Sequence, residues 1–146
     1  MATAQPAELQ QARSRGIELE LHENISDKSL AEFYQNASLT VYCSVAEGFG
    51  LPIVERVMAG VPCLASRLGS MKEIANQLGA CSLVNPFSTS EIATAITRLL
   101  RNHYELAHLT TEARQARWHT WSDYCEQIMD FVSSNTKNYP YPKIPE

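Results

Sequence analysis

The length, composition and charge of the chain describe a small globular domain: 146 residues, of which 45% are hydrophobic and 19% charged, suffice for one core. Twelve basic against sixteen acidic residues give a net charge of -4, which argues against nucleic acid as a partner, because phosphate-backbone binding normally requires a basic surplus. No apolar stretch resembles a membrane span or a signal peptide, so we expect a cytoplasmic protein.

The N-terminal part of the chain predicts a helix, a strand and a second helix. Residues 7–15 have a helical pattern that ends at Gly16, and the alternating apolar and charged residues at 17–21 are typical of a strand. Asp27 is placed to cap the second helix, whose apolar residues fall on one stripe, as in a helix that packs on a sheet. The members of that stripe are Leu30, Phe33, Tyr34 and Ala37.

The middle of the chain predicts alternating strands and helices. Residues 39–43 predict a buried strand, which a glycine-bearing loop at 44–50 follows. Pro52 suits the first turn of a helix that ends near Gly60, because its absent N–H would have no intrahelical partner there. Further elements are a strand at 61–66, a helix at 70–78 that ends at Gly79, and a strand at 81–84.

The C-terminal part predicts helices and a tail. A capping-box pattern at 88–91 precedes an apolar helical repeat, and further helical patterns cover 104–117 and 122–132. Three prolines after residue 132 predict an extended segment that adds little to the core. We therefore expect one domain over residues 1–132 and a tail over 133–146.

Strands that alternate with helices at this spacing predict βαβ units, and hence an α/β fold with a parallel sheet that carries helices on both faces. In such sheets ligands bind beyond the carboxyl ends of the strands. We therefore expect the loops at 22–27, 44–51 and 67–70 to share one rim and to carry the function.

One loop and the helix after it combine several groups that suit a nucleotide sugar. Glu55 lies near the predicted helix start, where the helix dipole favours an acid, and its carboxylate can accept hydrogen bonds from both hydroxyls of a ribose. Glu47 is the second carboxylate of the segment. Unpaired N–H donors at such a helix start suit phosphate or sugar oxygens. These donors belong to Gly48, Phe49, Gly50 and Leu51, and both glycines allow close approach and positive φ.

Each of these residues also has an ordinary structural explanation. Glu47 would then be a solvated loop charge, Glu55 a stabiliser of the first helical turn, and Phe49 a plug in the core. The combination of two glycines, a proline at the helix start and two acids eight positions apart is more specific than any single residue.

The segment Ser44 to Glu55, together with Met58-Ala-Gly-Val-Pro62 and Gly69-x-x-x-Glu73-Ile74, resembles the GT-B glycosyltransferases of family 4 with their EX7E signature. The resemblance implies the C-terminal, Rossmann-like, donor-binding domain of a two-domain enzyme. It further implies transfer of a sugar from a UDP- or GDP-linked donor to an acceptor, with retention of configuration and without a metal or other cofactor.

The resemblance assigns roles to residues of this chain. Glu47 corresponds to the catalytic acid that contacts the donor sugar near its reacting carbon, and Glu55 to the acid that holds the ribose hydroxyls. The remaining residues expected to contact the donor are Gly48, Phe49, Gly50 and Leu51 through their backbone, with Ser44 from the same motif and Asn24 from the loop beside the nucleobase.

The resemblance also implies parts that lie outside this sequence. In the family, an Arg and Lys pair earlier in the same domain contacts the diphosphate, and a separate N-terminal domain holds the acceptor. Near the loop this chain offers only Arg56, Arg67 and Lys72 as cations. We therefore expect the chain to be inactive alone, to need an N-terminal domain or partner chain, and to associate with membranes only through that part.

Two other functions compete with this interpretation. A non-catalytic module that keeps the fold and binds a partner chain is the alternative, since the cationic pair and the acceptor domain are absent here. A nucleotide-dependent oxidoreductase is weaker, because no G-x-G-x-x-G follows a predicted strand.

The four cysteines form no CxxC pair, and no His stands at metal-ligand spacing, so we expect reduced thiols and no metal site.

Overall fold

A computed structural model of the protein describes residues 7–135. The described chain divides into two compact units, residues 7–33 and residues 34–135. No helix within residues 7–135 combines the length and apolar character that crossing a membrane requires.

The first unit is helical and contains no strand among its described residues. Helix α1 (Ala7–Ser14) is present as predicted. Gly16, shortly after its end, has a φ of 75°. The strand predicted at 17–21 is wrong, because a strand forms only by bonding to a neighbouring strand, and all strands of the described sheet lie in the second unit. The apolar side chains of that segment, Ile17 and Leu21, are 51% and 58% exposed.

The second helix, α2 (Asp27–Asn36), is present as predicted, although its cap and its burial differ from expectation. The hydroxyl of Ser26 accepts a hydrogen bond from the Ser29 N–H over 3.2 Å, so Ser26 caps the helix and Asp27 stands in its first turn. None of the residues of α2 is buried, and Phe33 of its apolar stripe is 44% exposed.

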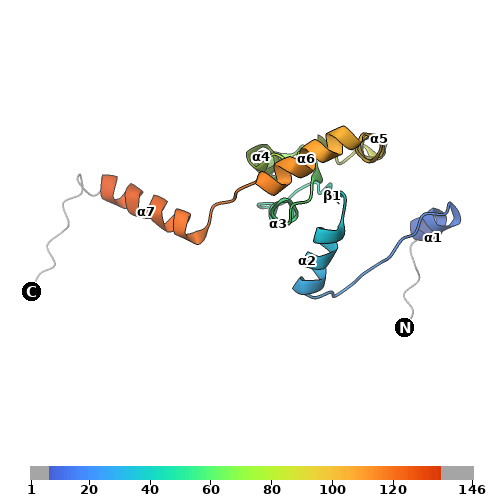
Figure 1. The fold of residues 1–146 in the computed structure, drawn as a ribbon, viewed down its shortest axis with the longest axis horizontal. Coiled ribbons are helices and arrows are strands. Elements are labelled where there is room, and N and C mark those ends of the chain that lie inside the picture. The colour runs from blue at the N-terminus through green and yellow to red at the C-terminus, as the bar shows by residue number, and fades with distance from the viewer. Residues whose placement is uncertain (1–6, 136–146) are drawn as a thin grey trace, which may run out of the picture. The chain divides into compact units, whose positions relative to one another are not determined.

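The second unit contains a parallel sheet, as the alternating pattern predicts, with three strands in the order β1-β2-β3. Its strands are β1 (Thr40–Tyr42), β2 (Cys63–Ser66) and β3 (Cys81–Val84). Helix α3 (Leu51–Met58) follows β1, and helix α4 (Gly69–Leu78) follows β2. Three helices follow β3: α5 (Thr89–Arg101), α6 (His103–Gln115) and α7 (Trp121–Asn135). Figure 1 labels β1 next to α3, α4 and α6.

The central strand β2 divides the core into two clusters. Successive side chains of a strand point to opposite faces of the sheet. Cys63 and Ala65 accordingly pack with side chains of α3 and α4, whereas Leu64 packs with Val84 of β3 and with Leu99 of α5. Helices therefore cover both faces of the sheet, which confirms the predicted α/β architecture.

Strand β1 lies at an edge of the described sheet, and this limits its burial. Thr40 is only 8% exposed, and its N–H and hydroxyl both donate to the carbonyl of Pro62 over 3.0 Å. The next residue, Val41, is 43% exposed. The expected strand at 39–43 is thus present, but the expectation that it is buried throughout is wrong.

The last helix, α7, has no buried residue. Trp118, just before it, is half-buried against the first core cluster, whereas Trp121 is 82% exposed. The helix continues to Asn135, so residues 133–135 of the segment expected to be extended are helical. The remainder of that segment, 136–146, lies outside the described residues.

Two adjacent leucines of α5 test the position of the core. Leu99 is 0% exposed in the second cluster and Leu100 is 49% exposed. We expect Leu99→Ala to lower the free energy of unfolding by about 2–5 kcal/mol, because it removes apolar contacts and leaves a cavity. Leu100→Ala should cost less than about 1 kcal/mol. Urea titration followed by circular dichroism measures both, and equal losses would contradict this packing.

Candidate functional site

The loop between β1 and α3 turns into the helix through a left-handed residue. Gly50 is the N-cap of α3, with a φ of 97° and a ψ of 33°, a conformation in which a side chain is strained. Pro52 follows in the first turn, as predicted, and no side chain caps the helix start. Gly48, which also permits a positive φ, does not adopt one, and a Cβ added there would meet nothing within 4 Å.

Glu47 is held by hydrogen bonds from three residues. The hydroxyls of Tyr42 and Ser44 both donate to its Oε1, over 2.5 Å and 3.0 Å. The hydroxyl of Ser70 donates to its backbone carbonyl over 3.0 Å. Ser70 stands at the start of α4, so the two loops after β1 and β2 meet at one rim, as predicted.

These hydrogen bonds determine the charge of the Glu47 carboxyl at neutral pH. The Tyr42 hydroxyl, and then that of Ser44, lower the pKa of Glu47 because both bonds favour its ionised form. The bond to Glu47 is also the main cause that raises the pKa of Tyr42, ahead of burial. At neutral pH the pair therefore consists of an anionic carboxylate and a neutral phenol that donates to it.

Glu55 is exposed on α3. The first turn of α3 contains no acidic residue, so the expectation that Glu55 lies at the helix start, where the dipole favours an acid, is wrong. The helix is anchored by three residues on its other side, Ile53, Val54 and Val57, which are buried. This amphipathic pattern leaves the Glu55 side chain in contact with solvent, where an incoming hydroxyl can reach it.

The aromatic residue of the loop is not a core plug. Phe49 is 50% exposed and Leu51 is 56% exposed. The ring of Phe49 meets that of Trp118 edge to face, with centroids 6.0 Å apart. Together with residues 119–121 and Tyr124, these side chains line an apolar hollow of about 600 Å³ beside the loop.

The cations expected near the loop have different surroundings. The guanidinium of Arg56 stacks between aromatic rings, with its Cζ 4.7 Å from the Tyr42 ring centroid. Arg67 forms an ion pair with Glu91 over 3.1 Å. Lys72 is exposed on α4. Two of the three candidate cations are thus engaged by other side chains.

Ser44 and Asn24, the remaining residues predicted to contact the donor, belong to different units of the chain. The Ser44 hydroxyl donates to Glu47 and to the carbonyl of Ala46. Asn24 belongs to the first unit, where it has a positive φ of 54°. The sequence interpretation missed Tyr42, whose only signal is its place at the end of a strand five residues before Glu47.

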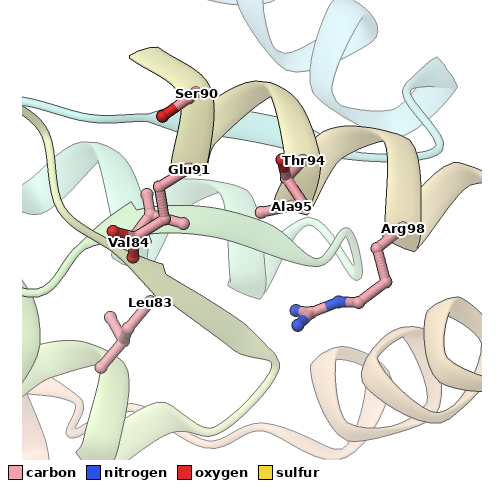
Figure 2. Close-up of a pocket in the computed structure, with 7 residues that line it drawn as sticks. All are labelled: Leu83, Val84, Ser90, Glu91, Thr94, Ala95 and Arg98. Atoms are coloured by element: carbon pink, nitrogen blue, oxygen red, sulfur yellow. The ribbon is translucent and has the colours of Figure 1, made fainter. Parts of the chain in front are cut away.

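A second hollow, of about 290 Å³, lies between β3 and α5 (Figure 2). Its charged groups are already paired: Glu91 accepts from Arg67 and from the Asn85 N–H, and Arg98 bonds Ser82 and Glu105. Among residues 7–135, no cluster of three or more His, Cys, Asp or Glu offers a metal site. The loop after β1 therefore remains the candidate site.

Comparison with known proteins identifies a family for this arrangement. The family described as "Glycosyl transferases group 1" matches residues 4–116. The MMP alpha-(1->4)-mannosyltransferase of Mycolicibacterium hassiacum is 36% identical over 92 residues, which are 62% of this chain and 22% of that protein. The serotype-specific mannosyltransferase WbdA of Escherichia coli is 31% identical over 107 residues, 73% of this chain and 13% of that protein.

A solved structure supports the fold. Sucrose-phosphate synthase from Thermosynechococcus elongatus aligns with a TM-score of 0.71 at 22% identity, over 90% of this chain and 33% of that one. The chain thus spans about a third of this structure and less than a quarter of the two mannosyltransferases.

The two glycines of the loop provide a matched test of its backbone. Gly50→Ala should lower the free energy of unfolding by about 1–2 kcal/mol, because an L-residue is strained at a φ of 97°. Gly48→Ala has neither a positive φ nor a neighbour within 4 Å and should change it by less than about 0.5 kcal/mol. Urea unfolding measures both, and equal effects would contradict the left-handed turn.

The bond between Tyr42 and Glu47 has a measurable signature. Tyr42→Phe removes the hydroxyl, so the pKa of Glu47 should rise toward its ordinary value of 4.5. Because that pKa is depressed in the folded state, the bond stabilises the fold above the unfolded pKa and ceases to do so as the pH falls through the folded value. Carboxyl carbon NMR over a pH titration gives the midpoint. Tyr34→Phe is the control, and a midpoint unchanged in Tyr42→Phe would refute the bond.

Proposed function

Because the chain belongs to the family of group 1 glycosyl transferases, we propose that it is the donor-binding part of a retaining hexosyltransferase. The enzyme takes a sugar from a UDP- or GDP-linked donor, and its loop is the E-x7-E signature of family 4. Mannose is the first donor sugar to test, because two of the relatives are mannosyltransferases by name.

The observation that carries this proposal is the uncapped start of α3 between two carboxylates. Gly50 turns the chain into the helix without a side-chain cap. Pro52 has no N–H and the Ile53 N–H donates to the Gly50 carbonyl over 2.9 Å, so Leu51 carries the first-turn N–H that is left for a ligand. The positive end of the helix dipole lies at the same place and favours anions. Backbone donors of residues 48–51 therefore bind the diphosphate and the sugar hydroxyls.

The two carboxylates have different roles because their surroundings differ. Glu55 is exposed on α3 and accepts hydrogen bonds from both ribose hydroxyls. Glu47 is held at Oε1 by two hydroxyls, which favour its ionised form. Its negative charge stabilises the cationic, oxocarbenium-like sugar that develops when the diphosphate departs. The leaving diphosphate gains negative charge at the same moment, which the fixed N–H donors stabilise.

The rest of the enzyme supplies what this chain lacks. Arg56 and Arg67 are engaged by aromatic rings and by Glu91, so the principal cations for the diphosphate come from other parts of the protein. The acceptor binds to a separate domain or to a partner chain. No metal takes part in the transfer.

Isosteric replacement of each carboxylate separates the two roles. In the enzyme that contains this chain and its acceptor domain, Glu55→Gln should weaken UDP or GDP binding by about 10- to 100-fold, because it removes hydrogen bonds to a charged acceptor. Glu47→Gln should lower kcat by about 100- to 1000-fold and leave nucleotide affinity unchanged. Titration calorimetry and a mannosyl-transfer assay measure these effects. Glu126→Gln, at an exposed acid of α7, is the matched control.

Nucleotide binding by the wild type decides whether the loop is a donor site. If the folded wild-type enzyme, which contains this chain and its acceptor domain, binds neither UDP nor GDP, the loop is not a nucleotide-sugar site. The second candidate function, a non-catalytic module for a partner chain, would then be favoured by the edge strand β1 and by α7, which has no buried residue. Light scattering that shows a monomer, with no partner recovered, would count against that module.

A further inference from the structure

Arg56 occupies an unusual place for a charged side chain. It follows Glu55 in α3, and its Cζ lies 4.7 Å from the ring centroid of Tyr42 and 5.2 Å from that of Tyr34. Both distances are within the range of about 6 Å over which a guanidinium is attracted to an aromatic face. The guanidinium is therefore held by two rings from different parts of the chain.

The hydrogen bonding of Arg56 indicates that these rings are its main partners. Its Nη1 is buried and has no hydrogen-bond partner, and no ion pair to it occurs among the described residues. Burying an unpaired cationic nitrogen is costly. The two aromatic faces offset part of that cost, so the contact with the rings is what the side chain gains by lying there.

One of the two rings leads directly to Glu47. The Tyr42 hydroxyl donates to Oε1 over 2.5 Å, and Ser44 donates to the same oxygen over 3.0 Å. The guanidinium on the Tyr42 face restricts the rotation of that ring and therefore the position of its hydroxyl. With both hydroxyls on Oε1, the second carboxylate oxygen, Oε2, is left to accept other hydrogen bonds.

We propose that Arg56 is a positioning residue for Glu47: it clamps the Tyr42 ring, whose hydroxyl holds Oε1 and leaves Oε2 for a hydroxyl of the donor sugar. This inference rests on the proposed function of Glu47. It differs from a role in binding phosphate, in which Arg56 would contact the diphosphate and its loss would weaken nucleotide binding directly.

A double-mutant cycle tests whether Arg56 acts through Tyr42. Arg56→Met keeps the aliphatic stem and removes the cation, and Tyr42→Phe keeps the ring and removes the hydroxyl. In the enzyme with its acceptor domain, each change should lower kcat by about 10- to 100-fold and leave UDP and GDP affinity within about 2-fold of wild type. Combined, they should lower kcat no further than Tyr42→Phe alone.

The same cycle is measured without nucleotide in the 146-residue chain. Each single change should raise the carboxyl titration midpoint of Glu47, followed by carbon NMR, and the double variant should match Tyr42→Phe. Tyr34→Phe is the matched control, because it removes a hydroxyl from the other ring and should shift neither midpoint nor kcat. If Arg56→Met does not fold, Arg56→Lys, which lacks the planar face, replaces it in the same cycle.

The outcomes separate this inference from the function on which it rests. The proposed clamp by Arg56 is wrong if the losses in kcat are additive, or if the titration midpoint of Glu47 does not move in Arg56→Met. Sugar transfer by the wild-type enzyme would in that case still support the proposed function. A large loss of UDP or GDP affinity in Arg56→Met would overturn it in favour of phosphate binding. If wild type binds no nucleotide although the midpoints shift as expected, the proposed function fails, and with it the catalytic purpose of the clamp.

Discussion

The left-handed turn at Gly50 is the constraint on which the rest of the site depends. A φ of 97° sends the chain from the loop after β1 directly into α3, where Ile53 and Val57 are buried in the first core cluster. The packing of these side chains fixes the helix, and the turn fixes the loop relative to it. Glu47 before the turn and Glu55 after it are consequently attached to one rigid junction at the rim of the sheet. A parallel sheet places such a rim beyond the carboxyl ends of its strands.

The loop is further restrained by side chains from three elements. Tyr42 at the end of β1 and Ser44 in the loop bond one carboxylate oxygen of Glu47, while Ser70 of α4 bonds its backbone carbonyl. Preorganisation of this kind matters for catalysis, because groups that are already oriented cost no reorganisation when charge develops in the transition state. The exposed carboxylate of Glu47 is therefore less mobile than its exposure alone would indicate.

The positive charges around the site serve the structure more directly than the ligand. Arg67 is paired with Glu91, which also accepts from the Asn85 N–H and so joins the ends of β2 and β3 to the start of α5. Arg56 is stacked on two tyrosine rings. The backbone N–H groups at the start of α3 are thus the clearest local donors for an anion.

The sequence by itself determined the features that act over a few residues. Gly50 and Pro52 predict the turn and the start of α3, and the short apolar run at 81–84 predicts β3. The spacing of the two acids, Glu47 and Glu55, identifies the loop as the candidate site. Tertiary structure decided the rest. The segment at 17–21 has a strand pattern but forms no strand, and the contact of Arg56 with Tyr42 joins residues fourteen positions apart. The physical reason is that strand pairing, burial and stacking depend on partners distant in the chain, which a local pattern does not specify.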